Sequence, residues 1–310
     1  METLKSRMET IYGKLAKLPA TAENLLQRKE ILCEVDAVLG TAMSEFDASL
    51  GEYYRECCRR VAQEIRDWNG TGARIWKLYS SAVIIKDCSG KVVAFDVNDG
   101  CVPESGRRTR LRIDYATAGA LADVIDIMFY THAHLDHVGM QMADALKERG
   151  KIVVAPQDTI DKWVLDGAIP AEECNLPNVN CYAGHQGFTL PNFAYAVKLA
   201  NKKTVFLRGD MYSGEELLPI LDKMQATSII PDLACLTHYK NSGPDPVPEI
   251  YGRFKCHMIP VHEWEFTHRK LGEAGLATQS YHDIHDYFAV PIADGKCHII
   301  TWGESLDFPA

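Results

Sequence analysis

Residues 131–139 constrain this chain more than any other segment. They read Thr-His-Ala-His-Leu-Asp-His-Val-Gly, after an apolar run typical of a buried strand (124–130) and before an amphipathic segment typical of a helix (140–146). His132 and His134 are two positions apart, so in extended backbone both point to the same side. Asp136 and His137 fall where the helix should begin. Four metal-capable side chains therefore converge at one strand-to-helix corner, enough for two neighbouring ions with positions left open for water.

A chance histidine cluster on a loop is the alternative explanation. With 11 His among 310 residues, His-x-His-x-Asp-His is expected by composition alone on the order of once in a thousand such chains. The segment resembles the signature of the metallo-β-lactamase-fold metallohydrolases, and its character is nearest to the branch that contains sugar-phosphate lactonases. The resemblance spans roughly residues 73–305. It implies an α/β protein, a four-layer αββα sandwich with the metals at one edge between the two sheets.

Composition indicates an ordinary globular protein with a sizeable core, because 46% of the residues are hydrophobic and 24% are charged. The first residues are charged and amphipathic, and no uninterrupted apolar run approaches about 18 residues. We therefore expect a cytoplasmic protein with no membrane partner. The ten Cys form no Cys-x-x-Cys pair, which favours reduced thiols. A net charge of −9 disfavours non-specific nucleic-acid binding, unless a local basic groove overrides it.

The first seventy residues carry three apolar stripes at helical spacing, closed by Asn-Gly-Thr-Gly at 69–72. The stripes are Leu4, Met8, Ile11, Leu15 and Leu18; Leu25, Leu26, Leu32, Val35, Val38 and Leu39; and Met43, Phe46, Leu50, Tyr53, Cys57, Val61, Ile65 and Trp68. We predict an all-helical extension at 1–70 and a catalytic domain at 71–310. The extension favours packing or dimerisation over catalysis, and could thus make a homo-oligomer.

Strands are predicted over 75–86 and 91–97, joined as a hairpin, and a closing edge strand over 296–302. The hairpin ends in Asp-Val-Asn-Asp-Gly at 96–100, which is similar to the family's Asp-x-Gly corner. In that corner a carboxylate orients a ligating His. An insertion leaves either Asp96 or Asp99 for this role, and an ordinary turn explains the same composition.

Three further segments resemble family corners that supply metal ligands. Ala-Gly-His-Gln-Gly at 183–187 is similar to the Gly-His corner and implies His185 as a ligand. Arg208-Gly209-Asp210 follows a predicted strand, and Asp210 resembles the bridging carboxylate. Arg208 replaces a small residue and points either into the core hairpin or toward an anionic substrate.

Two histidines at strand ends compete for the last ligand position, His238 and His262. Family order and the Met-Ile-Pro-Val-His segment at 258–262 imply His262. His238 is then a pocket residue, placed to bind substrate or to move a proton.

By this resemblance, His132, His134 and His185 hold one ion, Asp136, His137 and His262 hold the other, and Asp210 bridges them. Imidazole and carboxylate ligands suit zinc, with manganese or iron as alternatives. Two such ions lower the pKa of a shared water, so that a metal-bridging hydroxide attacks a carbonyl or phosphoryl group. Asp136 or a water returns the proton.

The resulting hypothesis is a dizinc hydrolase that cleaves a lactone, phosphodiester or thioester. The alternatives are a mononuclear iron dioxygenase of the same fold and a metal-stabilised regulatory protein that binds a partner through its helices. The substrate is expected to be small and anionic because basic residues cluster near the corners: Arg107, Arg108, Arg110, Arg112 and Lys240. A solvent-exposed loop explains the same arginines equally simply.

Overall fold

The computed structural model describes residues 2–44, 48–100, 111–187, 189–211, 214–237, 245–266 and 280–309. The helices are α1 (Leu4–Leu15), α2 (Leu25–Ser44), α3 (Ala48–Asp67), α4 (Tyr115–Val124), α5 (Met140–Glu148), α6 (Gln157–Trp163), α7 (Leu217–Ala226), α8 (Pro246–Phe254), α9 (Tyr281–Tyr287) and α10 (Ala289–Ala293), with 3-10 turns η1 (Ala22–Asn24) and η2 (Ala171–Glu173). Among these described residues no helix is both long and apolar enough to span a bilayer.

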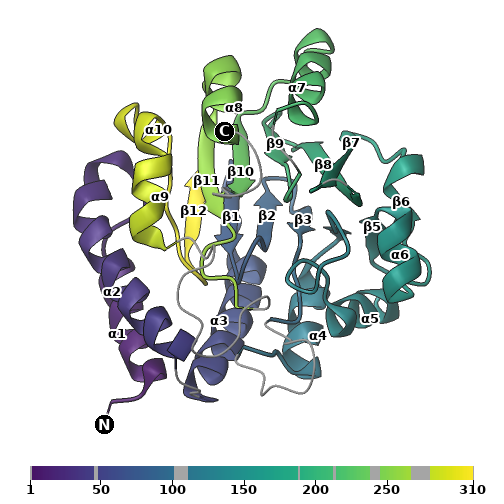
Figure 1. Ribbon diagram of the computed structural model, residues 1–310. Helices are drawn as coiled ribbons and strands as arrows, with labels where there is room; N and C mark the ends of the chain where they lie inside the picture. The colour runs from purple at the N-terminus through teal and green to yellow at the C-terminus, as the bar shows by residue number, and fades with distance from the viewer. Residues whose placement is uncertain are drawn as a thin grey trace.

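Two sheets form the centre of the molecule (Figure 1). The first has the strand order β12-β1-β2-β3-β4-β5-β6 and the second the order β11-β10-β9-β8-β7. The strands of the first sheet are β1 (Ala73–Lys77), β2 (Val83–Asp87), β3 (Val92–Phe95), β4 (Ile127–Phe129), β5 (Ile152–Ala155), β6 (Ile169–Pro170) and β12 (Ser305–Phe308). Those of the second are β7 (Val179–Gln186), β8 (Leu190–Lys198), β9 (Thr204–Leu207), β10 (Leu233–Thr237) and β11 (His257–Val261).

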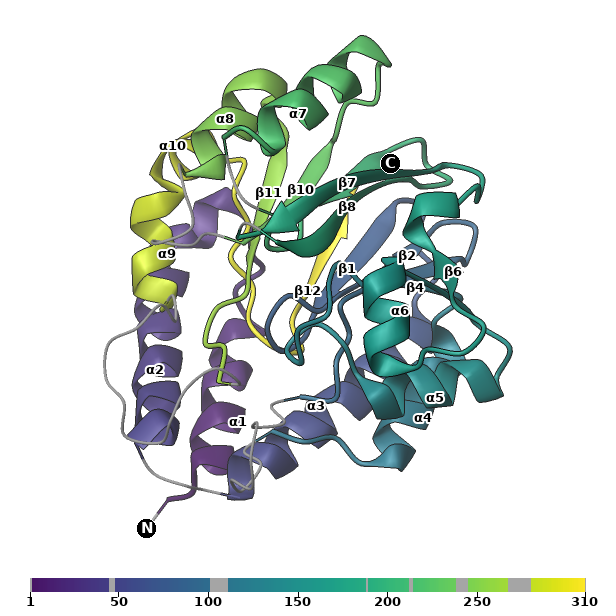
Figure 2. The same ribbon diagram turned by 45° about the vertical axis from the view of Figure 1, so that its right-hand side comes forward.

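Alternating burial along the strands builds the layers. Ile85 and Phe129 of the first sheet share one apolar cluster with Tyr195 and Leu207 of the second, so these faces pack against each other. The opposite faces bury their residues in a second cluster together with the helices. Helices α3, α4 and α5 cover the first sheet, and α7 and α8 cover the second (Figure 2). The predicted αββα sandwich with N-terminal helices is confirmed.

Parallel strands bring the predicted corners to one edge. In the first sheet β3 pairs with β4 and β4 with β5, and in the second β9 pairs with β10 and β10 with β11, all in parallel. The carboxyl ends of parallel strands lie at the same edge of a sheet, where the loops that follow them can form a site. The segments after β3, β4, β9 and β11 are the ones that carry Asp96, the histidine motif, Asp210 and His262.

Most of the described residues of the three N-terminal apolar stripes are buried within the chain, although Leu26 is exposed. Leu4, Met8, Val35 and Tyr54 belong to the same cluster as Trp76 of β1. These contacts cover much of each stripe, and the predicted homo-oligomer stays a prediction.

Two predicted strands are wrong. Residues 75–86 form β1 and β2, separated by a turn in which Ser80 has φ 57° and Leu78 N–H donates to Ala82 O. The mostly apolar residues on either side of Ser80 and Ser81 led us to expect one continuous strand. Residues 296–302 make only an isolated bridge between Cys297 and Met258, and the edge strand is β12.

Candidate metal centre

The histidine motif forms a tight turn between β4 and α5. Backbone N–H groups of His137 and Val138 both donate to His134 O, at 3.1 and 2.9 Å. Past the turn, the buried Asp99 carboxylate accepts from the backbone N–H of Gln141 (2.8 Å) and of Met142 (2.9 Å). It thereby satisfies free donors at the start of α5. The motif is held at one end by the sheet and at the other by this cap.

Asp96 is the residue that orients a motif histidine. Its Oδ1 accepts from Thr131 N (2.8 Å), and its Oδ2 lies 2.9 Å from Thr131 Oγ1 and 2.8 Å from His137 Nδ1. The backbone φ of Asp96 is 48°, a left-handed conformation that costs energy and recurs at functional sites. The alternative left open by the sequence is resolved: Asp96 contacts the histidine, and Asp99 caps the helix.

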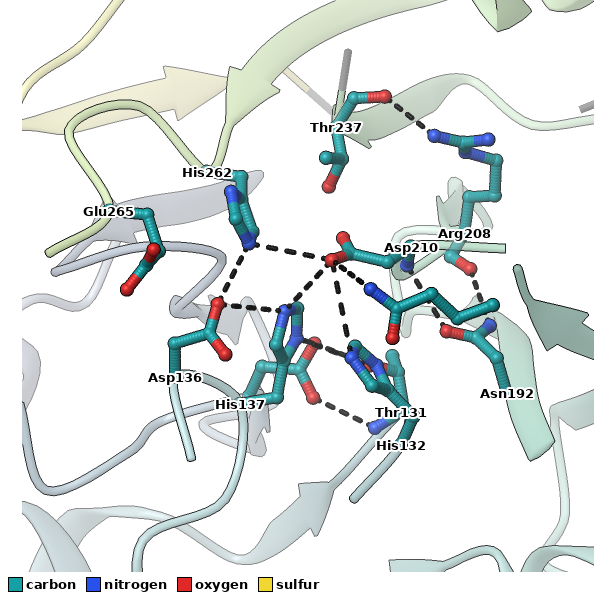
Figure 3. Close-up of polar contacts among 12 residues, drawn as sticks. Thr131, His132, Asp136, His137, Asn192, Arg208, Asp210, Thr237, His262 and Glu265 are labelled. Carbon is teal, nitrogen blue, oxygen red and sulfur yellow. Dashed lines mark hydrogen bonds and ion pairs between the residues drawn. The ribbon is translucent and has the colours of Figure 1, made fainter. Parts of the chain in front are cut away.

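Five buried side chains converge at the edge between the sheets (Figure 3). Asp210 Oδ2 lies 3.3 Å from His137 Nε2, 3.4 Å from His262 Nε2 and 4.0 Å from His132 Nε2. Asp136 Oδ2 lies 2.8 Å from His262 Nε2 and 3.4 Å from His137 Nε2. They form two overlapping groups, His132 with His137 and Asp210, and Asp136 with His137 and His262. Within each group the potential ligand atoms are within 4.8 Å of one another.

The unpaired atoms of this cluster fit a metal ion. His132 Nε2, His137 Nε2 and Asp210 Oδ1 are buried, and among the described residues none of them has a hydrogen-bond partner. Buried polar atoms without partners are costly, so their convergence indicates a bound group. Thr131 Oγ1 lies 3.0 Å from His132 Nδ1 and Asp96 holds His137 Nδ1, which leaves both Nε2 atoms facing the cluster. Nitrogen and oxygen donors of this kind suit zinc, manganese or iron.

The electrostatics of the cluster also favour a cation. Burial alone would lower the pKa of His137, yet Asp210, Asp136 and Asp96 raise it well above its usual value. Burial would raise the pKa of Asp210, but His262 and His137 lower it well below its usual value, so this carboxylate is ionised at neutral pH. Burial and the neighbouring His137 lower the pKa of His132 well below its usual value, which keeps that imidazole neutral. The cluster thus combines the neutral imidazole of His132 with the ionised carboxylate of Asp210, a donor set that attracts a cation.

Other predicted site residues lie elsewhere or cannot be placed. His134 is half-buried, with its ring 4.7 Å from the His132 ring, and belongs to neither group. His185 is exposed, and its Nδ1 lies 3.1 Å from Glu216 Oε1. Side chains alternate along β7, and the next residue, Gln186, donates to Asp210 Oδ2 at 3.3 Å. The ligand roles of His134 and His185 stay predictions. His238 lies outside the described residues.

The segment that carries Asp210 is held by two residues, one of which the sequence did not indicate. Asn192 Oδ1 accepts from Asp210 N (3.1 Å), and Asn192 Nδ2 donates to Arg208 O (3.0 Å). Gly209 has φ 63°, and a Cβ there would lie 2.7 Å from Thr131 Cβ. The Arg208 guanidinium is buried and donates to Thr237 O at 2.6 Å (Figure 3). It also donates to Met211 O. It therefore turns into the core and supports the backbone.

A buried ion pair lies behind His262. Lys77 of β1 is fully buried, donates to Pro260 O at 3.0 Å and pairs with the carboxylate of Glu263. His262 itself has φ 74°, and its N–H donates to Ser80 O at 3.1 Å. The sequence signal for this pair is a lysine with apolar residues on both sides. A lysine buried among such residues needs a buried partner of opposite charge.

A cavity of about 590 Å³ lies between α5 and the β5–α6–β6 segment, and none of the five clustered residues lines it. Two lining residues, Lys162 and Trp163, donate to Ala133 O at 3.1 and 3.0 Å. This cavity therefore adjoins the back of the histidine motif and not the cluster.

No protein-family model matches the chain, and no curated protein matches its sequence. Solved structures do resemble it. A possible metal-dependent hydrolase from Veillonella parvula is 14% identical, with a TM-score of 0.57 over 77% of this chain and 100% of that one. The isothiocyanate hydrolase from Delia radicum gut bacteria is 14% identical, with a TM-score of 0.54 over 76% and 99%. CmlA, a diiron β-hydroxylase from Streptomyces venezuelae, is 11% identical, with a TM-score of 0.56 over 77% and 55%. The chain has the metallo-β-lactamase fold that these neighbours share.

Proposed function

We propose that this protein is a metal-dependent hydrolase that cleaves an ester-like bond (lactone, phosphodiester or thioester) in a small anionic substrate. The observation that carries the proposal is the convergence of His132 Nε2, His137 Nε2 and Asp210 Oδ1, all buried and without hydrogen-bond partners among the described residues. Two fold neighbours are named as hydrolases, which supports the reaction class.

In this proposal His132 would contribute to one ion, Asp136, His137 and His262 to the other, and Asp210 to both. His134 and His185 complete the first set if their side chains turn toward the cluster. The bound ions would supply an activated water and polarise the oxygen of the scissile group. Zinc is the proposed metal, with manganese or iron as alternatives.

The protein's own groups prepare the site for that chemistry. Asp96 and Thr131 fix the two imidazoles through their Nδ1 atoms, so that no rotation is needed when an ion binds. Burial of the cluster excludes bulk water and strengthens each charge interaction. Asp136 is the proposed proton carrier, because its carboxylate lies between two imidazole Nε2 atoms.

The anionic character of the substrate rests on the basic residues identified in the sequence. Arg112 is exposed, while Arg107, Arg108, Arg110 and Lys240 lie outside the described residues. With a net charge of −9, anion attraction must be local, within a Debye length of about 8 Å. An arginine guanidinium can donate two parallel hydrogen bonds to one phosphate or carboxylate group.

A substrate panel tests the proposal. Zinc-loaded protein would be assayed with lactones, thioesters, cyclic nucleotides and phosphodiesters at low and high salt. We expect turnover of an anionic ester-like substrate that weakens as salt rises and disappears in Asp210→Asn. Preference for neutral acyl substrates, unchanged when the arginines are replaced, would contradict the anionic assignment.

A redox role is the second candidate, because the fold neighbour CmlA is named a diiron hydroxylase and the same donors accept iron. Protein loaded with Fe(II) would be monitored for oxygen consumption with the same panel. Oxygen uptake without hydrolysis would favour this alternative. Tight metal binding with neither reaction would favour a regulatory, metal-stabilised protein.

A further inference from the structure

The segment after His262 is fastened to the N-terminal helices. Trp264 Nε1 donates to Asp36 Oδ1 of α2 at 2.7 Å. The same carboxylate accepts from the backbone N–H of Tyr281 (2.8 Å) and of His282 (2.9 Å), at the start of α9. One aspartate of the helical extension thus joins the His262 segment and α9.

The indole ring also packs on α2, since a Cβ built at Gly40 would lie 3.7 Å from Trp264 Cη2. Asp36 and Gly40 of α2 thus contact the two ends of the indole. Trp264 is therefore an anchor and not a free surface side chain.

This anchoring matters because the segment adopts an unfavourable backbone. His262 has φ 74° and Trp264 has φ 52°, and left-handed conformations at bulky residues persist only where their surroundings impose them. On the β1 side, Lys77 pairs with Glu263, between the two strained residues. The backbone N–H of His262 donates to Ser80 O, and the Trp264 side chain contacts Asp36 and Gly40 of α2.

We propose that Asp36 is a positioning residue for the metal centre: by binding Trp264 Nε1 it holds His262 in the orientation that directs Nε2 at Asp136 and Asp210. The inference rests on the proposed metal centre and gives the helical extension a role in it. Asp36 touches no reacting group and acts through Trp264. Outer residues that orient metal ligands change metal affinity by about 10–100-fold when they are removed. For an anchor this distant we expect the lower end of that range.

The test compares four variants of the full-length, metal-free protein: Asp36→Ala, Trp264→Phe, the double variant that combines them, and Arg28→Lys. Trp264→Phe keeps an aromatic side chain and the Asp36 contacts to α9, but removes the indole donor and the Cη2 contact at Gly40. Arg28→Lys is the matched control, because Arg28 also lies on α2 and is buried. The described hydrogen bonds of Arg28 reach Leu18 O, Ile299 O (2.9 Å) and Glu304 (2.8 Å), and none of them reaches residues 262–266. Zn²⁺ affinity would be measured by competition with a chromophoric chelator, and Co²⁺ absorption would report ligand geometry.

We expect about tenfold weaker binding of one ion and an altered Co²⁺ spectrum in Asp36→Ala and Trp264→Phe, with no further loss in the double variant. Arg28→Lys should bind both ions with the same affinity as the wild type. The inference is overturned if Trp264→Phe binds metal normally, or if Arg28→Lys loses as much affinity as Asp36→Ala. Failure of the wild type to bind metal would overturn the proposed function as well, whereas normal binding by all variants would overturn only this inference.

Discussion

Asp96 Oδ2 lies 2.8 Å from His137 Nδ1, and this contact determines which imidazole nitrogen faces the cluster. A carboxylate that holds Nδ1 leaves Nε2 as the ring nitrogen that faces Asp136 and Asp210. The neighbouring carboxylate, Asp99, makes no such contact in the described structure and instead binds the N–H groups of Gln141 and Met142. Two aspartates three positions apart therefore have separable roles.

Asp96→Ala should weaken Zn²⁺ binding by about 10–100-fold, because His137 loses the group that orients it. Asp99→Ala is the matched control, since it also removes a buried carboxylate that accepts backbone N–H groups. It should lower the free energy of unfolding by about 1–2 kcal/mol with little change in metal affinity. Chelator competition and urea unfolding measure the two effects. Equal losses of affinity in both variants would contradict the assignment.

Asp210→Asn should reduce kcat by about a hundredfold or more, because an amide cannot supply the negative charge that the ions require. The fold should be largely retained, since Asp210 N can still donate to Asn192 Oδ1. Activity, metal content and Tm would be compared with those of Asp222→Asn, which alters an exposed carboxylate on α7. Full activity in Asp210→Asn would exclude a bridging role.

Purified, zinc-loaded protein should hold close to two ions per chain, as expected from the two overlapping donor groups. Elemental analysis after gel filtration gives the ratio, and removal with a chelator should lower Tm because the ions bind only the folded state. A ratio of one zinc would contradict the dinuclear proposal. A single iron would favour the dioxygenase alternative.

Stability should fall in mild acid partly because of His257 at the start of β11. Burial, His298 and Lys296 lower the pKa of His257 from 6.5 to about 4. The unfolded chain therefore takes up this proton first, and protonation favours unfolding as the pH falls from about 6.5 toward 4. The contribution of neutral His257 is complete above that window. In metal-free protein, His257→Gln should lose less stability than the wild type between pH 7 and 4.5, measured by urea unfolding. His282→Gln, at an exposed site on α9, is the control and should follow the wild type.

The fold class and most of the cluster could be predicted from the sequence, because the histidine motif and its strand-to-helix context are local patterns. Local patterns could not decide between Asp96 and Asp99, since both residues suit a turn and only the placement of α5 and His137 separates them. Arg208 was ambiguous for the same reason: its acceptors include Thr237 O, 29 positions away.

The helical extension shows the same limit. Its apolar stripes predicted helices, but not the residues that those helices contact. Asp36 binds Trp264, 228 positions away, and Arg28 binds Glu304, 276 positions away. The sequence indicated packing or dimerisation for residues 1–70 and no link to the metal site. The Asp36 contact argues that removal will weaken that site.

The pairing of β1 with β12 has a consequence during synthesis. Arg74 and Asp307 face each other across this strand pair at a separation of 233 positions. At a translation rate of about 5–20 residues per second, β12 is synthesised roughly 10–50 s after β1. Throughout that interval the nascent chain presents an unpaired strand edge beside apolar residues, a surface that promotes association with other chains. We therefore expect this protein to depend on chaperones while it is still on the ribosome.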